Sequence, residues 1–248
     1  MTSVVLVTGA SRGVGAQVAT RFADPGRHVI VNYREKARRA ADVVAAVRAA
    51  GGDASAVGAD VTDDLAVRAM FDDIAQRFGR LDVLVLNASG GLEPGADPGY
   101  PMRLNCDAQV RLVQLARPLL SAGGRIVFVT SHLAHFHGHR PVPADYLPIA
   151  VSKWTGEAAL RAELPAFEST EVTFVVVSGD MIEGSTMVRM FERRDPDAVA
   201  GRRAASGGLP TAGEFADAIV RATSEPHRNG DTVYVGGPDY LGEDGNTG

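Results

Sequence analysis

The sequence contains one stretch that decides its fold, Val7-Thr8-Gly9-Ala10-Ser11-Arg12-Gly13-Val14-Gly15, which joins a short apolar run to an amphipathic one. In such a turn the first glycine permits a tight bend and the second lets the backbone approach a pyrophosphate. The third allows the helix to pack closely on the strand. The N-terminus of the following helix offers free amide groups and a favourable dipole to an anion. A strand before the glycines and a helix after them therefore predict a dinucleotide-phosphate site.

Short β-branched runs alternate with longer amphipathic ones on both sides of this turn. The predicted strands are 4–7, 29–32, 54–59, 83–87, 126–130, 172–177 and 232–235, and the predicted helices lie near 14–23, 35–50, 63–78, 102–120, 148–164 and 211–224. Continuous apolar strands are typical of parallel sheets that are buried on both faces. We therefore predict an α/β fold: a Rossmann-type, doubly wound parallel sheet of about seven strands with helices on both faces. It forms a single domain over residues 1–248, with a loose tail at 242–248.

Composition limits the class of protein. Of the 248 residues, 45% are apolar and 22% charged, as in soluble globular proteins. The net charge of -5 argues against general nucleic-acid binding, and no apolar run approaches the roughly 18 residues that span a bilayer. Cys106 is the only cysteine, which excludes an internal disulfide and suits a reducing compartment. With no charged leader after Met1 we expect no secretory signal, and hence a cytoplasmic protein without membrane or nucleic-acid partners.

Residues 183–210 interrupt the alternation. They combine Met187, Met190 and Phe191 with several arginines between the sixth strand and the last helix. An insertion at the carboxyl edge of such a sheet lies where these folds bind ligands. We interpret the segment as a substrate lid, with a charged surface helix as the alternative.

The TGxxxGxG spacing of residues 8–15 resembles that of the short-chain dehydrogenase/reductase family. The resemblance continues along nearly the whole chain in Asp60-Val61, Asn87-Ala88-Ser89-Gly90, Asn105, Ser131 and Ser152-Lys153. It implies an oxidoreductase that moves a hydride between a nicotinamide cofactor and a carbonyl of a small-molecule substrate, and assembly as a homodimer or homotetramer. The cofactor-binding residues that we expect are Gly9, Ser11, Arg12, Gly13, Val14, Gly15, Asn32, Tyr33, Arg34, Asp60, Val61, Asn87, Ala88, Ser89, Lys153 and Gly179.

The end of the second strand favours NADP(H) over NAD(H). An NAD site usually places an acid there to bind the ribose hydroxyls, but this strand ends Val31-Asn32-Tyr33-Arg34-Glu35-Lys36. Cations at the start of a helix oppose its dipole unless an anion compensates. Together with Arg12 in the glycine turn, Arg34 and Lys36 predict a site for the 2′-phosphate.

The resemblance also implies roles for three residues of the chemical site. Ser131 would polarise the carbonyl, Lys153 would bind the nicotinamide ribose and lower the pKa of a tyrosine, and Asn105 would fix a water in the proton relay. The tyrosine itself, four residues before the lysine in the family, is Ile149 here. Two further departures are Leu86, in place of the usual first Asn of NNAG, and Ser178, in place of Pro before Gly179.

Tyr146 is the nearest replacement, seven residues before Lys153. Pro148 suits the first turn of a helix, which leaves Tyr146 in the preceding loop, where it folds back over the pocket as proton donor or packs at the rim. The same loop holds four histidines, of which His132 or His135 is the other candidate donor, because imidazole titrates near neutral pH. No obvious set of metal ligands accompanies them.

Three functions remain open from the sequence. The leading hypothesis is an NADPH-dependent carbonyl reductase with a non-standard proton donor. The second is a reductase of imine, iminium or enone substrates, which need no acid at the position of Ile149. The third is an inactive NADP-binding regulatory protein, because a fold alone does not establish activity.

Overall fold

The structure, a computed structural model, describes residues 2–92, 95, 97–167 and 170–237. Its centre is a sheet of seven strands, all parallel, in the order β3-β2-β1-β4-β5-β6-β7. The strands are β1 (Ser3–Val7), β2 (Arg27–Tyr33), β3 (Asp53–Gly58), β4 (Leu81–Leu86), β5 (Leu120–Ser131), β6 (Thr173–Gly179) and β7 (Thr232–Val235). The connections leave β1 in one direction and β4 in the other, so the switch point of this doubly wound sheet lies between β1 and β4.

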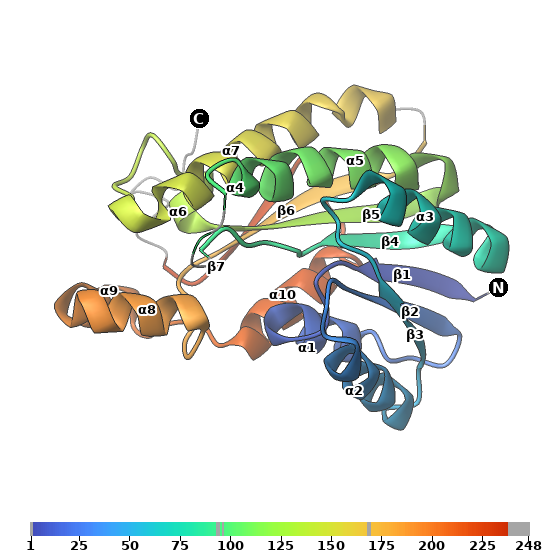
Figure 1. The fold of residues 1–248 in the computed structure, drawn as a ribbon, viewed down its shortest axis with the longest axis horizontal. Helices are drawn as coiled ribbons and strands as arrows, with labels where there is room; N and C mark the ends of the chain where they lie inside the picture. Colours follow the sequence, from blue (N-terminus) through green and yellow to red (C-terminus); the bar gives the residue numbers. More distant parts are fainter. Residues whose placement is uncertain (1, 93–94, 96, 168–169, 238–248) are drawn as a thin grey trace.

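Helices cover both faces of the sheet (Figure 1). One layer contains α1 (Gly13–Arg21), α2 (Ala37–Ala49) and α10 (Ala212–Ala222), and the other contains α3 (Asp64–Phe78), α5 (Ala108–Ala116) and α7 (Leu147–Ala162). Successive residues of a strand face opposite sides, so Val5 and Val7 pack in one core cluster while Val4 and Leu6 pack in the other. The predicted doubly wound α/β fold is confirmed.

The helix predicted near 102–120 is present as one continuous helical run over 100–119, but its pattern is not α-helical throughout. The chain forms α4 (Tyr100–Met102), a π-helical turn over Arg103–Asp107, α5 and a 3₁₀ turn over Arg117–Leu119, after which β5 begins. Pro118 lies in the 3₁₀ turn, where a missing amide hydrogen ends the α-helical pattern. The π turn brings the carbonyl of Asn105 so close to α7 that a Cβ at Gly156 would overlap its oxygen.

The interval 183–210 folds into two short helices at the carboxyl edge of the sheet. These are α8 (Thr186–Arg194) and α9 (Pro196–Ser206), which extend away from the sheet (Figure 1, orange). The side chain of Ser185 accepts a hydrogen bond from the amide of Val188 in the first turn of α8, and that of Asp195 accepts one from the amide of Ala198 in the first turn of α9. Gly207 ends α9 in the left-handed conformation. A four-residue helix, α6 (His132–His135), follows β5. The predicted tail at 242–248 lies outside the described residues.

Replacing Gly156 tests the close contact between α7 and the π turn. Overpacking a core typically costs about 1–3 kcal/mol, so we expect Gly156→Ala to lower the free energy of unfolding by that amount in urea titrations. The matched control is Gly201→Ala in α9, where an added Cβ would meet nothing within 4 Å. It should leave stability unchanged or raise it by up to about 1 kcal/mol. A Gly156→Ala protein as stable as wild type would contradict the contact.

Candidate active site at the carboxyl edge of the sheet

Two adjoining cavities open at the carboxyl edge of the sheet. The first, of about 660 Å³, is bordered by the glycine turn after β1, and the second, of about 500 Å³, by the ends of β5 and β6. The residues that border both are Arg12, Val14, Asn87, Ser89, Ile182, Ser185 and Thr186. Because the two cavities share this wall at the switch point of the sheet, one extended ligand fits across both.

The glycine turn brings backbone to the edge of the first cavity. Gly9 and Gly13 have φ angles of +63° and +59°, in a region that favours glycine. A Cβ at Gly15 would lie 2.5 Å from Asn87 Nδ2 and 2.8 Å from the carbonyl oxygen of Gly9. All three positions therefore require glycine, and the amides at the start of α1 remain close to the cavity.

Polar side chains tie this turn to the neighbouring strands. Thr8 Oγ1 accepts a 3.0 Å hydrogen bond from the backbone amide of Asn87, whose Nδ2 donates to the carbonyl of Thr8 at 2.9 Å. On the other side, Asn32 Oδ1 accepts from the amide of Gly9 at 3.2 Å, and Asn32 Nδ2 donates to the carbonyl of Ala59 at 3.0 Å. Asn32 and Asn87 thus hold the floor of the cavity in addition to bordering it.

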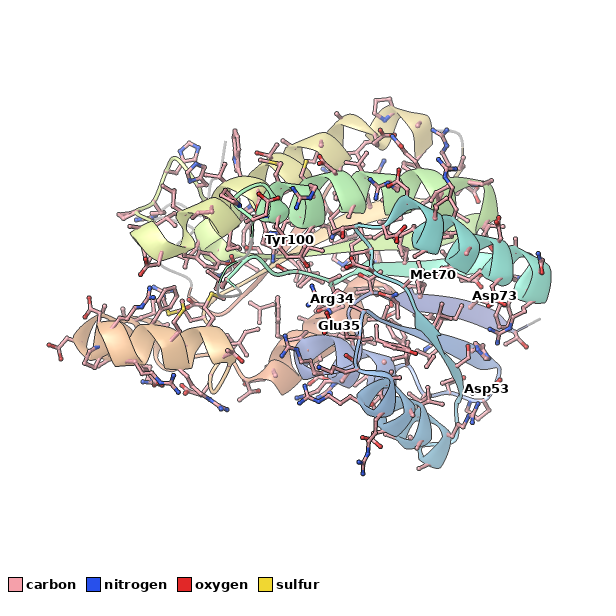
Figure 2. The ribbon with its side chains drawn as sticks, in the orientation of Figure 1. Arg34, Glu35, Asp53, Met70, Asp73 and Tyr100 are labelled. Atoms are coloured by element: carbon pink, nitrogen blue, oxygen red, sulfur yellow. The ribbon has the colours of Figure 1, made fainter. Side chains whose placement is uncertain are left out.

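Basic side chains border the first cavity: Arg34, Lys36 and Arg39 lie at its outer end, away from the second cavity, and Arg12 lies on the wall that the two cavities share. Glu35 lies between two of them and pairs with Arg34 at 3.1 Å and with Lys36 at 3.9 Å. Arg34 also donates a 2.5 Å hydrogen bond to the hydroxyl of Tyr100, which comes from α4 on the other helix layer (Figure 2). This arrangement gives the outer end of the cavity a positive potential that suits an anionic group.

The second cavity brings together Ser131, Tyr146 and Lys153. Ser131 ends β5, and Tyr146 ends a 3₁₀ turn over Ala144–Tyr146 directly before α7. Ser131 Oγ and the Tyr146 hydroxyl lie 3.0 Å apart, within hydrogen-bond distance. Lys153 lies inside α7, seven residues after Tyr146. The loop does fold Tyr146 back onto Ser131, as one of the two sequence interpretations requires.

Burial governs the ionisation of Tyr146 and Lys153. The Tyr146 side chain is almost fully buried, which raises its pKa, while the hydrogen bond with Ser131 acts in the opposite direction. Burial lowers the pKa of Lys153 from its ordinary value of 10.5 to about 8. Across the described part of the chain, no hydrogen bond or ion pair holds the Lys153 ammonium group. At neutral pH Tyr146 is therefore a neutral hydroxyl, and Lys153 is mostly charged.

Asn105 lies behind the second cavity, in the π turn. Its Nδ2 donates to the carbonyl of Gly90 at 3.1 Å and to Ser152 Oγ at 3.0 Å, and its Oδ1 pairs with Ser89 Oγ at 3.0 Å. The side chain is buried and borders neither cavity. Asn105 thus joins the loop after β4 to α7.

The three departures from the family pattern lie in different places. Ile149 borders the second cavity, and its Cδ1 would lie 2.6 Å from a Cβ at Gly91. Leu86 is buried in the core cluster between the sheet and the layer of α3, α5 and α7, and Ser178 Oγ lies 2.8 Å from His132 Nδ1. Only Ile149 therefore changes the wall of the site directly.

The two candidate histidines point away from Ser131. His132 is buried, and its Nδ1 and Nε2 lie within hydrogen-bond distance of Ser178 Oγ and the carbonyl of Gly236. His135 contacts Glu157 at 2.8 Å and the Tyr234 hydroxyl at 3.2 Å. Neither histidine borders either of the two cavities described above. These contacts argue against the hypothesis that either histidine is the proton donor.

Most of the predicted cofactor-binding residues border a cavity. The first is bordered by Gly9, Ser11, Arg12, Gly13, Val14, Gly15, Asn32, Arg34, Asp60, Val61, Asn87, Ala88 and Ser89, and the second by Lys153 and Gly179. The exception is Tyr33, whose ring packs against Gly58. Because successive side chains of β2 face opposite sides, Asn32 faces the turn and Tyr33 does not. Tyr33 therefore borders neither of the two cavities.

Three residues that border the cavities were missed from the sequence: Arg39, Tyr100 and Ile182. Thr186, Met187 and Met190 also border them and fall within the segment 183–210 that was interpreted as a substrate lid. Arg39 follows Lys36 by three residues, a spacing that places both on neighbouring parts of a helix surface, so its position could have been inferred. The others come from α4 and from the segment after β6, whose approach to the cavities depends on packing.

Two negative findings apply to the described residues alone. Among them, no three His, Cys, Asp or Glu side chains are grouped so that they could ligate a metal. None of the helices in this part of the chain combines the length and the apolar character that a membrane span requires.

The burial of Lys153 predicts a pH-dependent cost in stability. The folded state lowers the lysine pKa from 10.5 to about 8, so below pH 8 folding places a charge in an apolar site. Lys153→Met removes that charge and should raise the free energy of unfolding at pH 7 by about 3 kcal/mol, as 1.36 kcal/mol per pKa unit implies. From pH 8 to 10.5 the unfolded chain binds more protons than the folded one, so wild type gains stability and the difference shrinks. Chemical denaturation of both proteins at several pH values measures this difference in the free energy of unfolding. A difference that does not change with pH would contradict the lowered pKa of Lys153.

Comparison with known proteins identifies relatives of this chain. The family model described as short chain dehydrogenase matches residues 3–193. The 1-cyclohexenylcarbonyl-CoA reductase of Streptomyces collinus is 43% identical over 192 residues, which cover 74% of this chain and 66% of that protein. The chain spans between about half and two thirds of the length of the curated relatives that it matches first.

Solved structures share the fold over nearly the whole chain. The angucycline C-6 ketoreductase LanV with bound NADP superposes with a TM-score of 0.79 and 27% identity, covering 94% of this chain and 93% of LanV. A short-chain dehydrogenase from Burkholderia cenocepacia J2315 in complex with NADP gives a TM-score of 0.78 and 29% identity, covering 94% and 96%. With the family model matching most of the chain and the glycine turn, Ser131 and Lys153 arranged around one site, this protein belongs to the short-chain dehydrogenase family.

Proposed function

We propose that this protein is an NADP(H)-dependent reductase that transfers a hydride to the carbonyl group of a small molecule, with Tyr146 as the proton donor. One observation carries the proposal: the Ser131 and Tyr146 hydroxyls, 3.0 Å apart, share a cavity with Lys153 that adjoins the cavity of the glycine turn. The two solved relatives with bound NADP support the choice of cofactor.

The residues of the first cavity fit a 2′-phosphorylated dinucleotide. Gly13 has no Cβ to block the approach of a pyrophosphate to the start of α1. Arg34 and Lys36 border the outer end and Arg12 the glycine turn, and these cations would hold the 2′-phosphate by charge-assisted hydrogen bonds. When bound, the reduced cofactor supplies the hydride.

The second cavity supplies polarisation and a proton. The Ser131 and Tyr146 hydroxyls would donate hydrogen bonds to the carbonyl oxygen, which accumulates negative charge as the hydride arrives. Tyr146 is neutral at pH 7, so it has a proton to give. The Lys153 ammonium group, in the same cavity, would favour the phenolate that this transfer leaves behind. Asn105 holds the loops around the site through its bonds to Ser89, Gly90 and Ser152.

The cofactor assignment is tested by direct binding. Arg34→Ala removes a charged partner of the 2′-phosphate, and a hydrogen bond to a charged group is worth about 1.5–3 kcal/mol. We expect the Kd for NADPH to rise about 10- to 100-fold, while the Kd for NADH changes little. Fluorescence titration measures both. The control is Arg38→Ala, an exposed arginine of α2 that borders neither cavity. Wild-type protein without saturable NADPH binding would refute the proposed cofactor.

A second candidate function is reduction of a double bond conjugated to a carbonyl. Tyr146 lies about one helical turn further from Lys153 than position 149 does. In conjugate reduction the hydride adds to the β-carbon and the proton goes to the carbonyl oxygen, so the two reacting atoms are further apart than in a ketone. The resulting enol then returns to the carbonyl form. The 43% identical relative is by name a 1-cyclohexenylcarbonyl-CoA reductase, and that substrate name describes a double bond conjugated to a thioester carbonyl, which supports this second candidate.

A substrate panel separates the two candidates. Loss of a general acid typically costs 10²- to 10⁴-fold, so we expect Tyr146→Phe and Ser131→Ala to lower kcat/KM by about 100-fold or more on the preferred substrates, measured as NADPH oxidation. Saturated ketones and α,β-unsaturated ketones or thioesters of similar size are compared with wild type. Higher kcat/KM on the saturated ketones supports carbonyl reduction, and the reverse order supports conjugate reduction. A fully active Tyr146→Phe variant would show that Tyr146 is not the proton donor.

A further inference from the structure

Tyr146 lacks the support that a residue inside a helix has. It is the residue before α7, with φ and ψ of -96° and -11°, and its side chain makes no capping bond. Its amide donates to the carbonyl of Pro143 at 2.9 Å, which closes a single 3₁₀ turn. At position 149 a tyrosine would be held on both sides by the helical backbone. The orientation of Tyr146 therefore depends on contacts from outside α7.

Those contacts come from α8. The Tyr146 ring meets the Phe191 ring edge-on, with centroids 6.1 Å apart and an interplanar angle of 76°. Both rings belong to a buried cluster, separate from the two cores of the sheet, to which Val188, Val199 and Leu209 also contribute. Because these residues lie on or beside α8 and α9, Tyr146 is packed between α7 and the segment 183–210.

A polar contact acts beside the ring contact. Asp145, the residue before Tyr146, forms an ion pair with Arg194 in the last turn of α8. Both side chains are more than half exposed, so the pair adds little to stability by itself. Arg194 lies three residues after Phe191, so the two side chains project from adjacent turns of α8. One helix thus holds both members of the dipeptide Asp145-Tyr146.

The same helix also borders the second cavity. Met187 and Met190 form part of its wall, together with Tyr146 and Ile149. Met187 precedes Phe191 by four residues and Met190 precedes Arg194 by four, so each cavity residue lies one turn from a residue that contacts the 145–146 dipeptide. A substrate that packs against the methionines also presses on the helix that supports the proton donor.

We propose that α8 positions the proton donor: Phe191 through its ring and Arg194 through Asp145 hold the Tyr146 hydroxyl against Ser131. Phe191 and Arg194 are positioning residues, because neither borders the second cavity. The inference rests on the proposed function, since it assigns to α8 a role in proton transfer.

Phe191→Leu tests the ring contact, because leucine keeps an apolar side chain but removes the ring edge. An aromatic pair contributes enough beyond its buried area to change a rate by about 3- to 10-fold. We expect kcat to fall by that factor, with KM and the Kd for NADPH within about 2-fold of wild type. In the Tyr146→Phe background the same substitution should have no further effect on kcat, as a double-mutant cycle requires for residues that act together.

Arg194→Gln tests the ion pair with little risk to folding, because the side chain is exposed. We expect kcat to fall by about 2- to 5-fold, and Asp145→Asn to behave in the same way. The matched control is Arg193→Gln, the adjacent exposed arginine, which should leave kcat unchanged. A crystal structure of Phe191→Leu provides a readout without turnover: the Tyr146 hydroxyl should lie beyond hydrogen-bond distance of Ser131 Oγ.

The outcomes separate this inference from the proposed function. If Tyr146→Phe loses activity while Phe191→Leu and Arg194→Gln keep it, the positioning inference is wrong and the proton donor stands. If Phe191→Leu lowers kcat equally in the wild-type and Tyr146→Phe backgrounds, Phe191 acts through another group and the inference is also wrong. If Tyr146→Phe is fully active, the proposed donor fails, and the distance between Ser131 and Tyr146 in the Phe191→Leu crystal still decides whether α8 holds the tyrosine.

Discussion

The close approach of β1 and β4 at the glycine turn is the constraint on which the rest of the site depends. Asn87 occupies the space that a Cβ at Gly15 would need, and it hydrogen-bonds to the backbone of Thr8. This contact holds the two strands together at the switch point, where the crossovers diverge and leave an opening above the sheet. Asn87 borders both cavities, so both lie next to this switch point.

The chemical site lies in a part of the molecule where burial opposes charge. Lys153 sits in α7 with its ammonium group close to apolar surroundings, and the desolvation that lowers its pKa also weakens the folded state at neutral pH. Tyr146 experiences the same environment with the opposite consequence, because burial keeps its hydroxyl protonated. One apolar pocket therefore holds a neutral Tyr146 hydroxyl and a Lys153 ammonium group that is mostly charged at pH 7.

The helix pair α8–α9 is tied to the sheet edge as well as to the Tyr146 loop. Asp180, which follows β6, is buried and pairs with Arg202 of α9 at 2.6 Å, and Arg203 pairs with Glu183 at 2.7 Å. These pairs tie α9 to the chain that follows β6, while Phe191 of α8 contacts the Tyr146 ring. A buried pair with several hydrogen bonds resists separation much more than an exposed one does, so the Asp180–Arg202 pair is stronger than the exposed pair between Asp145 and Arg194.

The sequence by itself determined the fold class, the glycine turn and the basic end of the first cavity, because each depends on residues close together in the chain. Strand and helix periodicity, the turn requirement for glycine and the cations after β2 are local properties. Tertiary structure alone decided which side chain meets Ser131. Tyr146 is fifteen residues from Ser131 in the chain, and its direction depends on how the loop packs between α7 and α8. The same reason applies to Tyr33, His132 and His135, which border neither cavity. Residue type and order suggest a role, but only packing decides which side chain reaches the cavity.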